Sequence, residues 1–215
     1  MSPPRFEQNA VVYSDSDGQP IAENTLQFRW IVTIKEGIEA LFRDDPRVFV
    51  AGDLLWYPVE GDPTTRVAPD ALVVFGRPRG DRGSYLQWEE EGVAPQVVFE
   101  VLSPGNRFGE MLRKFQFYER YGVEEYYLYD PDHNRLEGWR REGDRLLDID
   151  PMNGWTSPRL RLRFDWTDAG LRLIRPDGRP LETYQELEQR AEADRVRADR
   201  LAAQLRALGV EPETL

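Results

Sequence analysis

The sequence contains no cysteine, and His133 is its single histidine among 215 residues. The absence of cysteine excludes disulfide bonds, thiolate catalysis and zinc sites held by cysteine. One histidine excludes a histidine-rich metal site, and His133 itself lies in the turn-like stretch PDHNR. A metal site in this chain would therefore use oxygen ligands, which favour hard ions such as Mg²⁺, Mn²⁺ or Ca²⁺.

Long apolar runs are also missing. No stretch approaches the roughly 20 apolar residues that a membrane-spanning helix needs. The opening MSPPRFEQN has neither the basic start nor the apolar centre of a secretion signal. We therefore expect a cytoplasmic protein that does not interact with membranes.

Positive charge is in deficit, since 28 Lys and Arg face 39 Asp and Glu, for a net charge of −11. Nonspecific nucleic-acid binding depends on neutralising phosphates with Lys and Arg, so the balance argues against a nuclease unless the charges are segregated. The composition does indicate a folded protein, because 40% of residues are hydrophobic and 12% are aromatic. The length suits one sizeable core with an appendage.

Two carboxylates interrupt runs that are typical of buried strands. Asp70 stands at the start of VAPDALVVF, and Glu100 lies inside PQVVFEVLSP. Strand alternation leaves both faces of the second run apolar around Glu100. A buried carboxylate must be neutral or meet a cation, because an unpaired buried charge is very costly. Alternatively, Asp70 is a turn residue and Glu100 pairs privately with an arginine or with backbone amides.

The order of predicted elements indicates a mixed α/β (α+β) fold with helices covering a sheet. Apolar residues at helical spacing predict a first helix, which Asn24 or Thr25 can cap. Antiparallel β-structure is expected beyond Asp132. The predicted core elements are a helix over 25–42, strands at 48–58, from 70 and around 97–102, a helix over about 108–121 and a strand at 124–131.

The C-terminal third predicts one more strand and a long helix. RLRLRFDW (159–166) alternates, with its leucines and aromatics facing inward and its arginines outward. Residues 181–208 form a helix through which a heptad can be drawn, although Asp194 interrupts the apolar seam. A coiled-coil homodimer and a solvated helix remain equally open. We expect a domain over 1–180 and a C-terminal helix over 181–215.

Lys114 lies on the second predicted helix, in GEMLRKFQFYERYG. Helical spacing places Glu110, Phe117, Tyr118 and Tyr121 on the same broad face. Alone, Lys114 would be an ordinary surface partner of Glu110 at i,i+4 spacing. The aromatic neighbours instead favour an inward face, where a lysine needs a counter-charge that the strand carboxylates can supply.

The motif order PD, then EVLSP, then a helical lysine, then YGVEEYYLYDP resembles the Uma2 (DUF820) family of restriction-endonuclease-like proteins. That family belongs to the PD-(D/E)XK nuclease superfamily, and the resemblance covers about residues 10–140. It implies a Mg²⁺- or Mn²⁺-dependent endonuclease that hydrolyses DNA phosphodiester bonds. It also implies a restriction-endonuclease-like core carrying extra antiparallel β-structure and a C-terminal helix.

Carried over by position, the resemblance makes Asp70, Glu100 and Lys114 the catalytic residues. Asp70 and Glu100 would hold the metal together with the Val101 carbonyl, and Lys114 would position the attacking water. Glu23 matches an additional acidic ligand, although many Uma2 proteins have a histidine near that point. Leu102 departs from the superfamily pattern, in which a lysine follows the strand carboxylate by two residues.

Basic clusters and tryptophans offer sites for nucleic acid, although each is more often ordinary surface or core. These candidates are Arg77, Arg79, Arg82, Arg159, Arg161, Arg163, Trp88 and Trp139. Two other functions remain open beside the nuclease. One is a binding or regulatory module that has lost cleavage, and the other is an assembly protein joined through the 181–208 helix.

Overall fold

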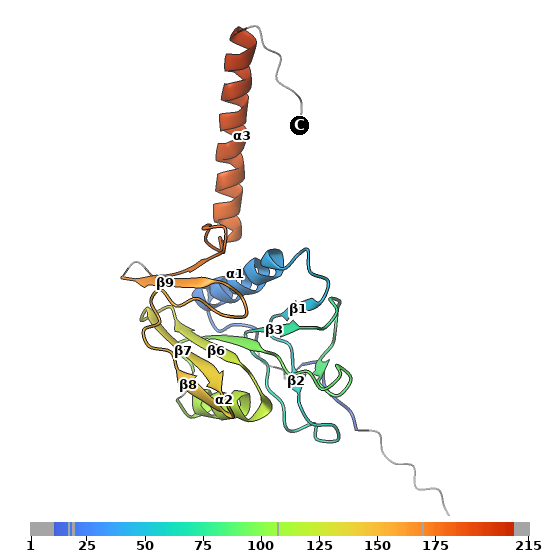
Figure 1. Cartoon of the computed structure of the whole chain (residues 1–215). Helices are drawn as coiled ribbons and strands as arrows, with labels where there is room; N and C mark the ends of the chain where they lie inside the picture. The colour runs from blue at the N-terminus through green and yellow to red at the C-terminus, as the bar shows by residue number, and fades with distance from the viewer. Residues whose placement is uncertain (1–10, 17, 19, 107, 169, 209–215) are drawn as a thin grey trace, which may run out of the picture. The chain divides into compact units, whose positions relative to one another are not determined.

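The computed structural model describes residues 11–16, 18, 20–106, 108–168 and 170–208 (Figure 1). The chain divides into two compact units, residues 1–181 and 182–215. Each unit is described by itself. Among the described residues, no helix is long and apolar enough to cross a membrane.

A six-stranded mixed sheet forms the centre of the first unit, in the order β1-β3-β5-β6-β7-β8. The β5–β6 pair is parallel, and the other neighbouring pairs are antiparallel. The predicted mixed α/β fold is therefore confirmed. The strands are β1 (Val48–Ala51), β3 (Ala71–Phe75), β5 (Val97–Val101), β6 (Glu125–Asp130), β7 (Arg135–Glu142) and β8 (Arg145–Asp148).

Two helices cover opposite faces of this sheet (Figure 1). Helix α1 spans Thr25–Leu41, and the Asn24 side chain caps it by accepting from the Gln27 amide. Helix α2 spans Phe108–Tyr121 and ends before Gly122, whose φ of 94° suits glycine. The parallel β5–β6 connection runs through α2, as such crossovers usually do.

Strand β5 contributes side chains to the apolar layers on both faces of the sheet. Val97, Phe99 and Val101 pack in the layer that includes α1. Val98 packs on the other side, with residues of α2 such as Tyr118. Glu100 shares the face of Val98 by strand alternation, so its carboxylate is directed to the α2 side.

Smaller strands complete the first unit. Strands β2 (Trp56–Tyr57) and β4 (Tyr85–Leu86) form a short parallel pair. Strands β9 (Arg163–Thr167) and β10 (Gly170–Ile174) form an antiparallel pair whose inner residues, such as Phe164 and Leu173, join the α1-side layer. The antiparallel structure expected beyond Asp132 is present.

Two predicted strands are wrong in extent. The 48–58 strand is split because Asp53 adopts a φ of 50° and its amide donates to the Pro69 carbonyl at 3.0 Å. In 159–166, residues before 163 form a turn in which the Arg161 amide donates to Ser157 O at 2.8 Å. Leu160 and Leu162 are nevertheless buried as expected, because the turn folds both leucines into the core.

Helix α3 (Tyr184–Ala207) makes up most of the second unit. Thr183 and Glu186 form a reciprocal capping box at its start. None of its residues is buried. Its apolar side chains are exposed, among them Leu187, Val196, Leu201 and Leu205.

Candidate active site

Asp70 stands directly before β3, at the point where this strand meets β5. Ala71 pairs with Phe99, so Asp70 lies across from Glu100 in the antiparallel register. The Val101 amide donates to Asp70 Oδ2 at 2.6 Å. The PD sequence therefore does more than make a turn, because it fixes a carboxylate beside Glu100.

Glu100 is 2% exposed in the middle of β5. Its Oε2 accepts from Lys114 Nζ at 2.8 Å, and its Oε1 accepts from the Tyr118 hydroxyl. Both donors come from one face of α2, since 114 and 118 are one helical turn apart. The buried charge thus meets a cation and a neutral donor.

Lys114 contacts a buried carboxylate and still reaches the solvent. Its side chain keeps 19% exposure, and its Nζ also approaches the Ala68 carbonyl at 3.4 Å. Glu110, which lies four residues earlier on α2, lines one cavity together with Lys114. The structure therefore brings together Asp70, Glu100 and Lys114, the three residues predicted to be catalytic.

The electrostatics of this group are strongly coupled. Burial, and then the charge of Glu100, raise the pKa of Asp70 well above its usual range, against the opposing effect of Lys114. Burial lowers the pKa of Lys114, but the charges of Glu100 and Asp70 outweigh it, so the net shift is upward. Burial and the Glu100 charge also raise the pKa of the Tyr118 hydroxyl. At neutral pH Lys114 is charged and Tyr118 is a hydrogen-bond donor.

A cavity of about 440 Å³ opens onto this group. Asp70 and Lys114 line it, together with Asp53, Gln27 and Glu23. The acidic side chains therefore face a space that a small ligand can enter. This combination of a cavity with shifted titratable groups is typical of active sites.

Glu23 lies on the wall of the same cavity but binds the chain elsewhere. Its Oε2 accepts from the Ser103 hydroxyl and from the Gly105 amide at 3.1 Å. A Cβ at position 105 would lie 2.1 Å from that oxygen, so this approach requires glycine. Within the described ranges, no three His, Cys, Asp or Glu side chains form a group that could hold a metal. The role of Glu23 as an additional ligand stays a prediction.

Residues 11–167, most of the chain, match the sequence pattern of Uma2, a family described as "Putative restriction endonuclease". The chain belongs to the Uma2 family. No curated protein matches it. A crystal structure titled a putative nuclease belonging to DUF820, from Anabaena variabilis ATCC 29413, resembles it with 16% identity and a TM-score of 0.45. That similarity covers 62% of this chain and 73% of the other.

Gln27 is a site residue of this Uma2 protein that the sequence reasoning missed. It is 5% exposed, its Nε2 donates to the Val101 carbonyl at 2.8 Å, and its Oε1 accepts from the Glu23 amide at 2.8 Å. A signal was present, because Gln27 lies in helical register with Ile31, Ile34 and Ile38. A polar residue in an apolar stripe needs partners, and here they are the end of β5 and the entry to α1.

Tyr118 was predicted on the Lys114 face, but its bond to Glu100 was not. It is fully buried and stacks parallel to Trp56, with ring centroids 6.5 Å apart. This packing fixes the hydroxyl on Glu100. In this Uma2 protein the helix thus supplies two donors to the carboxylate, where the strand has only Leu102.

Glu125 is a second buried carboxylate, and its hydrogen bonds are typical of a structural role. It is also 2% exposed, yet among the described residues it accepts only from neutral donors: the hydroxyls of Tyr127 and Ser157 and the Arg159 amide. It meets no lysine among the described residues. Glu100 and Glu125 stand on neighbouring strands of one sheet, so they form a natural pair for comparison.

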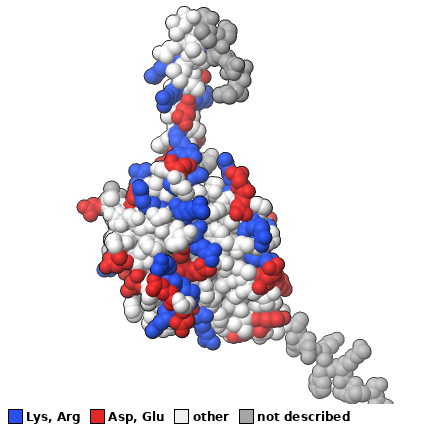
Figure 2. Space-filling model, viewed as in Figure 1, with Lys and Arg blue, Asp and Glu red and all other residues white. Residues whose placement is uncertain are grey.

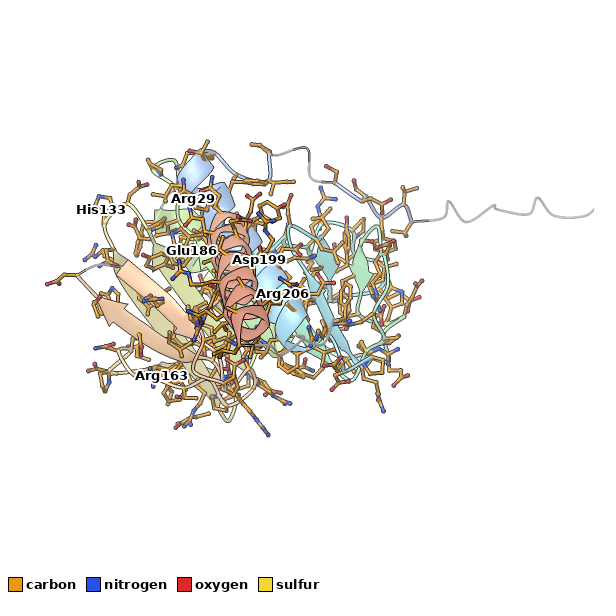
Figure 3. The ribbon with its side chains drawn as sticks, turned by 90° about the horizontal axis from the view of Figure 1, so that it is seen from above. Arg29, His133, Arg163, Glu186, Asp199 and Arg206 are labelled. Carbon is orange, nitrogen blue, oxygen red and sulfur yellow. The ribbon has the colours of Figure 1, made fainter. Side chains whose placement is uncertain are left out.

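The basic clusters predicted as nucleic-acid candidates are mostly neutralised. Arg77 and Arg82 both pair with Glu90, and Arg159 pairs with Glu124. Arg163 pairs with Asp165, and Figure 3 shows Arg163 and His133 at the periphery of the ribbon. The face in Figure 2 likewise shows acidic and basic side chains interspersed. These clusters do not provide a separate positive surface.

The tryptophans in question pack as structural residues. Trp139 stacks on Tyr126 at 4.9 Å between ring centroids, and Trp88 lies 5.0 Å from Tyr13. His133 is exposed and its ring nitrogen Nδ1 bonds Asp130 at 2.8 Å in the β6–β7 turn. His133 is therefore a turn residue, as its sequence context suggests.

Proposed function

We propose that this Uma2 protein is a metal-dependent nuclease that hydrolyses phosphodiester bonds of DNA. The observation that supports this most directly is that Asp70, Glu100 and Lys114 come together, with Asp70 and Lys114 lining one cavity. The family description as a restriction endonuclease points the same way. We assign the chemistry to residues 1–180.

The donor chemistry fits a hard divalent ion such as Mg²⁺ or Mn²⁺. Asp70 and Glu100 offer carboxylate oxygens, and Val101, whose amide donates to Asp70, offers a carbonyl oxygen that accepts from Gln27. Burial and then the charge of Glu100 raise the pKa of Asp70, and a bound cation would offset the repulsion between the two carboxylates. When bound, such an ion supplies Lewis-acid activation of the phosphodiester and lowers the pKa of a water molecule.

The chain's own residues can position the attacking water and stabilise the charge that develops during hydrolysis. Lys114 is charged and still partly exposed, so its ammonium can donate to the attacking water or to the phosphate oxygens as negative charge develops. Tyr118 holds Glu100 in place, and Gln27 holds the Val101 carbonyl. Hydrolysis consumes one water: its oxygen bonds to phosphorus, the bond to the leaving oxygen breaks, and that oxygen takes up a proton.

Purified protein is expected to cut plasmid DNA with Mg²⁺ or Mn²⁺ and to leave it intact with EDTA. Asp70→Asn is expected to lose this cleavage, because the neutral amide keeps the Val101 bond but cannot hold a cation as a carboxylate does. Gel assays of supercoiled, nicked and linear DNA check both. If wild type matches Asp70→Asn under every metal, the protein is not a nuclease on this substrate.

Cleavage is also expected to rise with pH. Asp70 must lose its proton to bind a cation, and its pKa is raised, so activity appears as the pH passes that raised pKa. Initial rates at constant ionic strength, with Mg²⁺ well below saturation, give the profile, because saturating Mg²⁺ would displace the proton from Asp70 even at low pH. A rate that falls as the pH rises from acid to neutral would contradict this role for Asp70.

For residues 181–215 we propose self-association into a homodimer through α3. The heptad positions Leu187, Leu201 and Leu205 are exposed, and no residue of the helix is buried. Deleting 182–215 is expected to halve the mass measured by light scattering while cleavage persists. If the full and the shortened protein contain the same number of chains per particle, α3 does not join copies of this protein.

A further inference from the structure

A second cavity adjoins the candidate active site. It measures about 450 Å³ and lies between residues 64–67 and one face of α2. It shares Val67, Glu110 and Lys114 with the first cavity. The two cavities thus form one groove that passes Lys114. Its outer part is lined by Arg66, Arg113 and Arg120, which we call the arginine groove.

The arginine groove is positive in a chain whose net charge is −11. Its three arginines and Lys114 face one acidic lining residue, Glu110. Nothing in the described parts of the chain forms an ion pair with these three arginines, unlike Arg77, Arg82, Arg159 and Arg163. Their charge is therefore available to a ligand.

What these arginines do contact leaves their charge in place. Arg66 donates to the Tyr57 hydroxyl at 3.0 Å, and its guanidinium lies 5.9 Å from that ring centre. The Arg120 guanidinium lies 5.4 Å from the Tyr121 ring centre. A neutral aromatic orients a guanidinium without neutralising it. All three arginines are exposed, so they meet solvent.

The helix sets a regular spacing along the groove. Arg113 and Arg120 are seven residues apart on α2, so two helical turns separate them by ~10.5 Å along the axis. Phosphates on one strand of duplex DNA advance ~3.4 Å per nucleotide along the axis. Because a strand also winds around that axis, its phosphates lie farther apart in space than this rise, and the two arginines are far enough apart to contact different phosphates of one strand. Arginine is well suited to phosphate because its fork donates two hydrogen bonds.

We propose that the arginine groove binds the phosphate backbone of the DNA strand that leads into the candidate active site. This inference rests on the proposed function and adds to it the surface that binds the substrate. It also answers the charge objection, because the needed cations are concentrated at one groove while the excess of acid lies elsewhere. The phosphates beyond the scissile bond lie along α2, and Lys114 meets the scissile one.

The test compares two double variants that lose equal charge. Arg113→Ala/Arg120→Ala removes both helix cations, and Arg135→Ala/Arg172→Ala removes two exposed arginines of β7 and β10 that line neither cavity. Fluorescence anisotropy with a labelled DNA duplex, in EDTA so that nothing is cut, gives Kd over a series of NaCl concentrations. Thermal unfolding of each variant verifies that it is folded.

The groove variant is expected to bind at least about 10-fold more weakly and to lose between one and two units of salt slope, since each phosphate contact contributes about 0.9. The control variant is expected to stay within about 2-fold of wild type. Arg113→Lys/Arg120→Lys is expected to keep most of the salt slope, because the charges remain.

Equal binding by the groove and control variants overturns the inference, as does a wild type that does not bind DNA. These outcomes can be distinguished from those that test the proposed nuclease function. If the groove variant loses binding while wild type fails to cut under every metal, the arginine groove stands and the nuclease proposal fails. If wild type cuts and the groove variant binds and cuts as well as the control, the nuclease stands and the groove inference fails.

Discussion

Glu100→Gln is expected to lower the rate of metal-dependent DNA cleavage by at least about 1000-fold, equivalent to about 4 kcal/mol of transition-state stabilisation. The glutamine keeps the size of the side chain, its oxygen can still accept from Lys114, and the Tyr118 hydroxyl can turn to accept from its NH2. It cannot supply the charge that a divalent ion needs. Single-turnover cleavage of a labelled duplex measures the loss.

Glu125→Gln is the matched control. Glu125 is equally buried on the adjacent strand, but its partners are two hydroxyls and the Arg159 amide. The glutamine oxygen can stay on the Arg159 amide, but its NH2 then faces both hydroxyls, which lose a charged acceptor and must reorient, so we expect a loss of about 1–3 kcal/mol of stability. Cleavage by the folded fraction is expected to match wild type. Equal loss of cleavage in both variants would show that burial of charge, and not a catalytic role, explains Glu100.

Lys114→Met is expected to affect stability and activity together. It leaves Glu100 buried without its cation, and breaking a buried pair in this way costs about 3–5 kcal/mol. For a chain of this size, the midpoint of thermal unfolding is expected to fall by about 10 °C. Cleavage is expected to fall by about 100-fold or more, because no cation stabilises the developing charge.

A double variant separates the two effects. In Lys114→Met/Glu100→Gln the uncompensated charge is absent, so most of the lost stability is expected to return while cleavage stays absent. If the single variant is as stable as wild type at neutral pH, the Lys114–Glu100 contact does not matter for the fold.

Much of the fold followed from local patterns. Alternation and apolar runs located β3, β5 and β6, and helical spacing located α1 and α2 to within a few residues. The first half of the predicted 159–166 strand was wrong, because contacts with another strand outweighed the local alternation. The buried Glu125 takes hydrogen bonds from Ser157 and the Arg159 amide, which curls that segment into a turn.

The candidate site was predictable where motif order was informative. Asp70, Glu100 and Lys114 were all named from sequence, and the structure brings them together. Gln27 and the arginine groove were missed for a shared reason. Each depends on which helix face meets which loop, and sequence spacing alone does not report that. The visible arginine clusters, in contrast, had nearby carboxylates such as Glu90 that neutralise them.

The contacts that build the candidate site also determine at which point of protein synthesis the site can form. They join residues that are far apart in sequence: Gln27 with Val101, Glu23 with Ser103 and Lys114 with Ala68. Contacts of long sequence separation form late, because their loops must close first. A ribosome-bound chain that has not released α2 offers Asp70 and Glu100 without their lysine. A growing polypeptide therefore acquires this constellation only after α2 has left the ribosome.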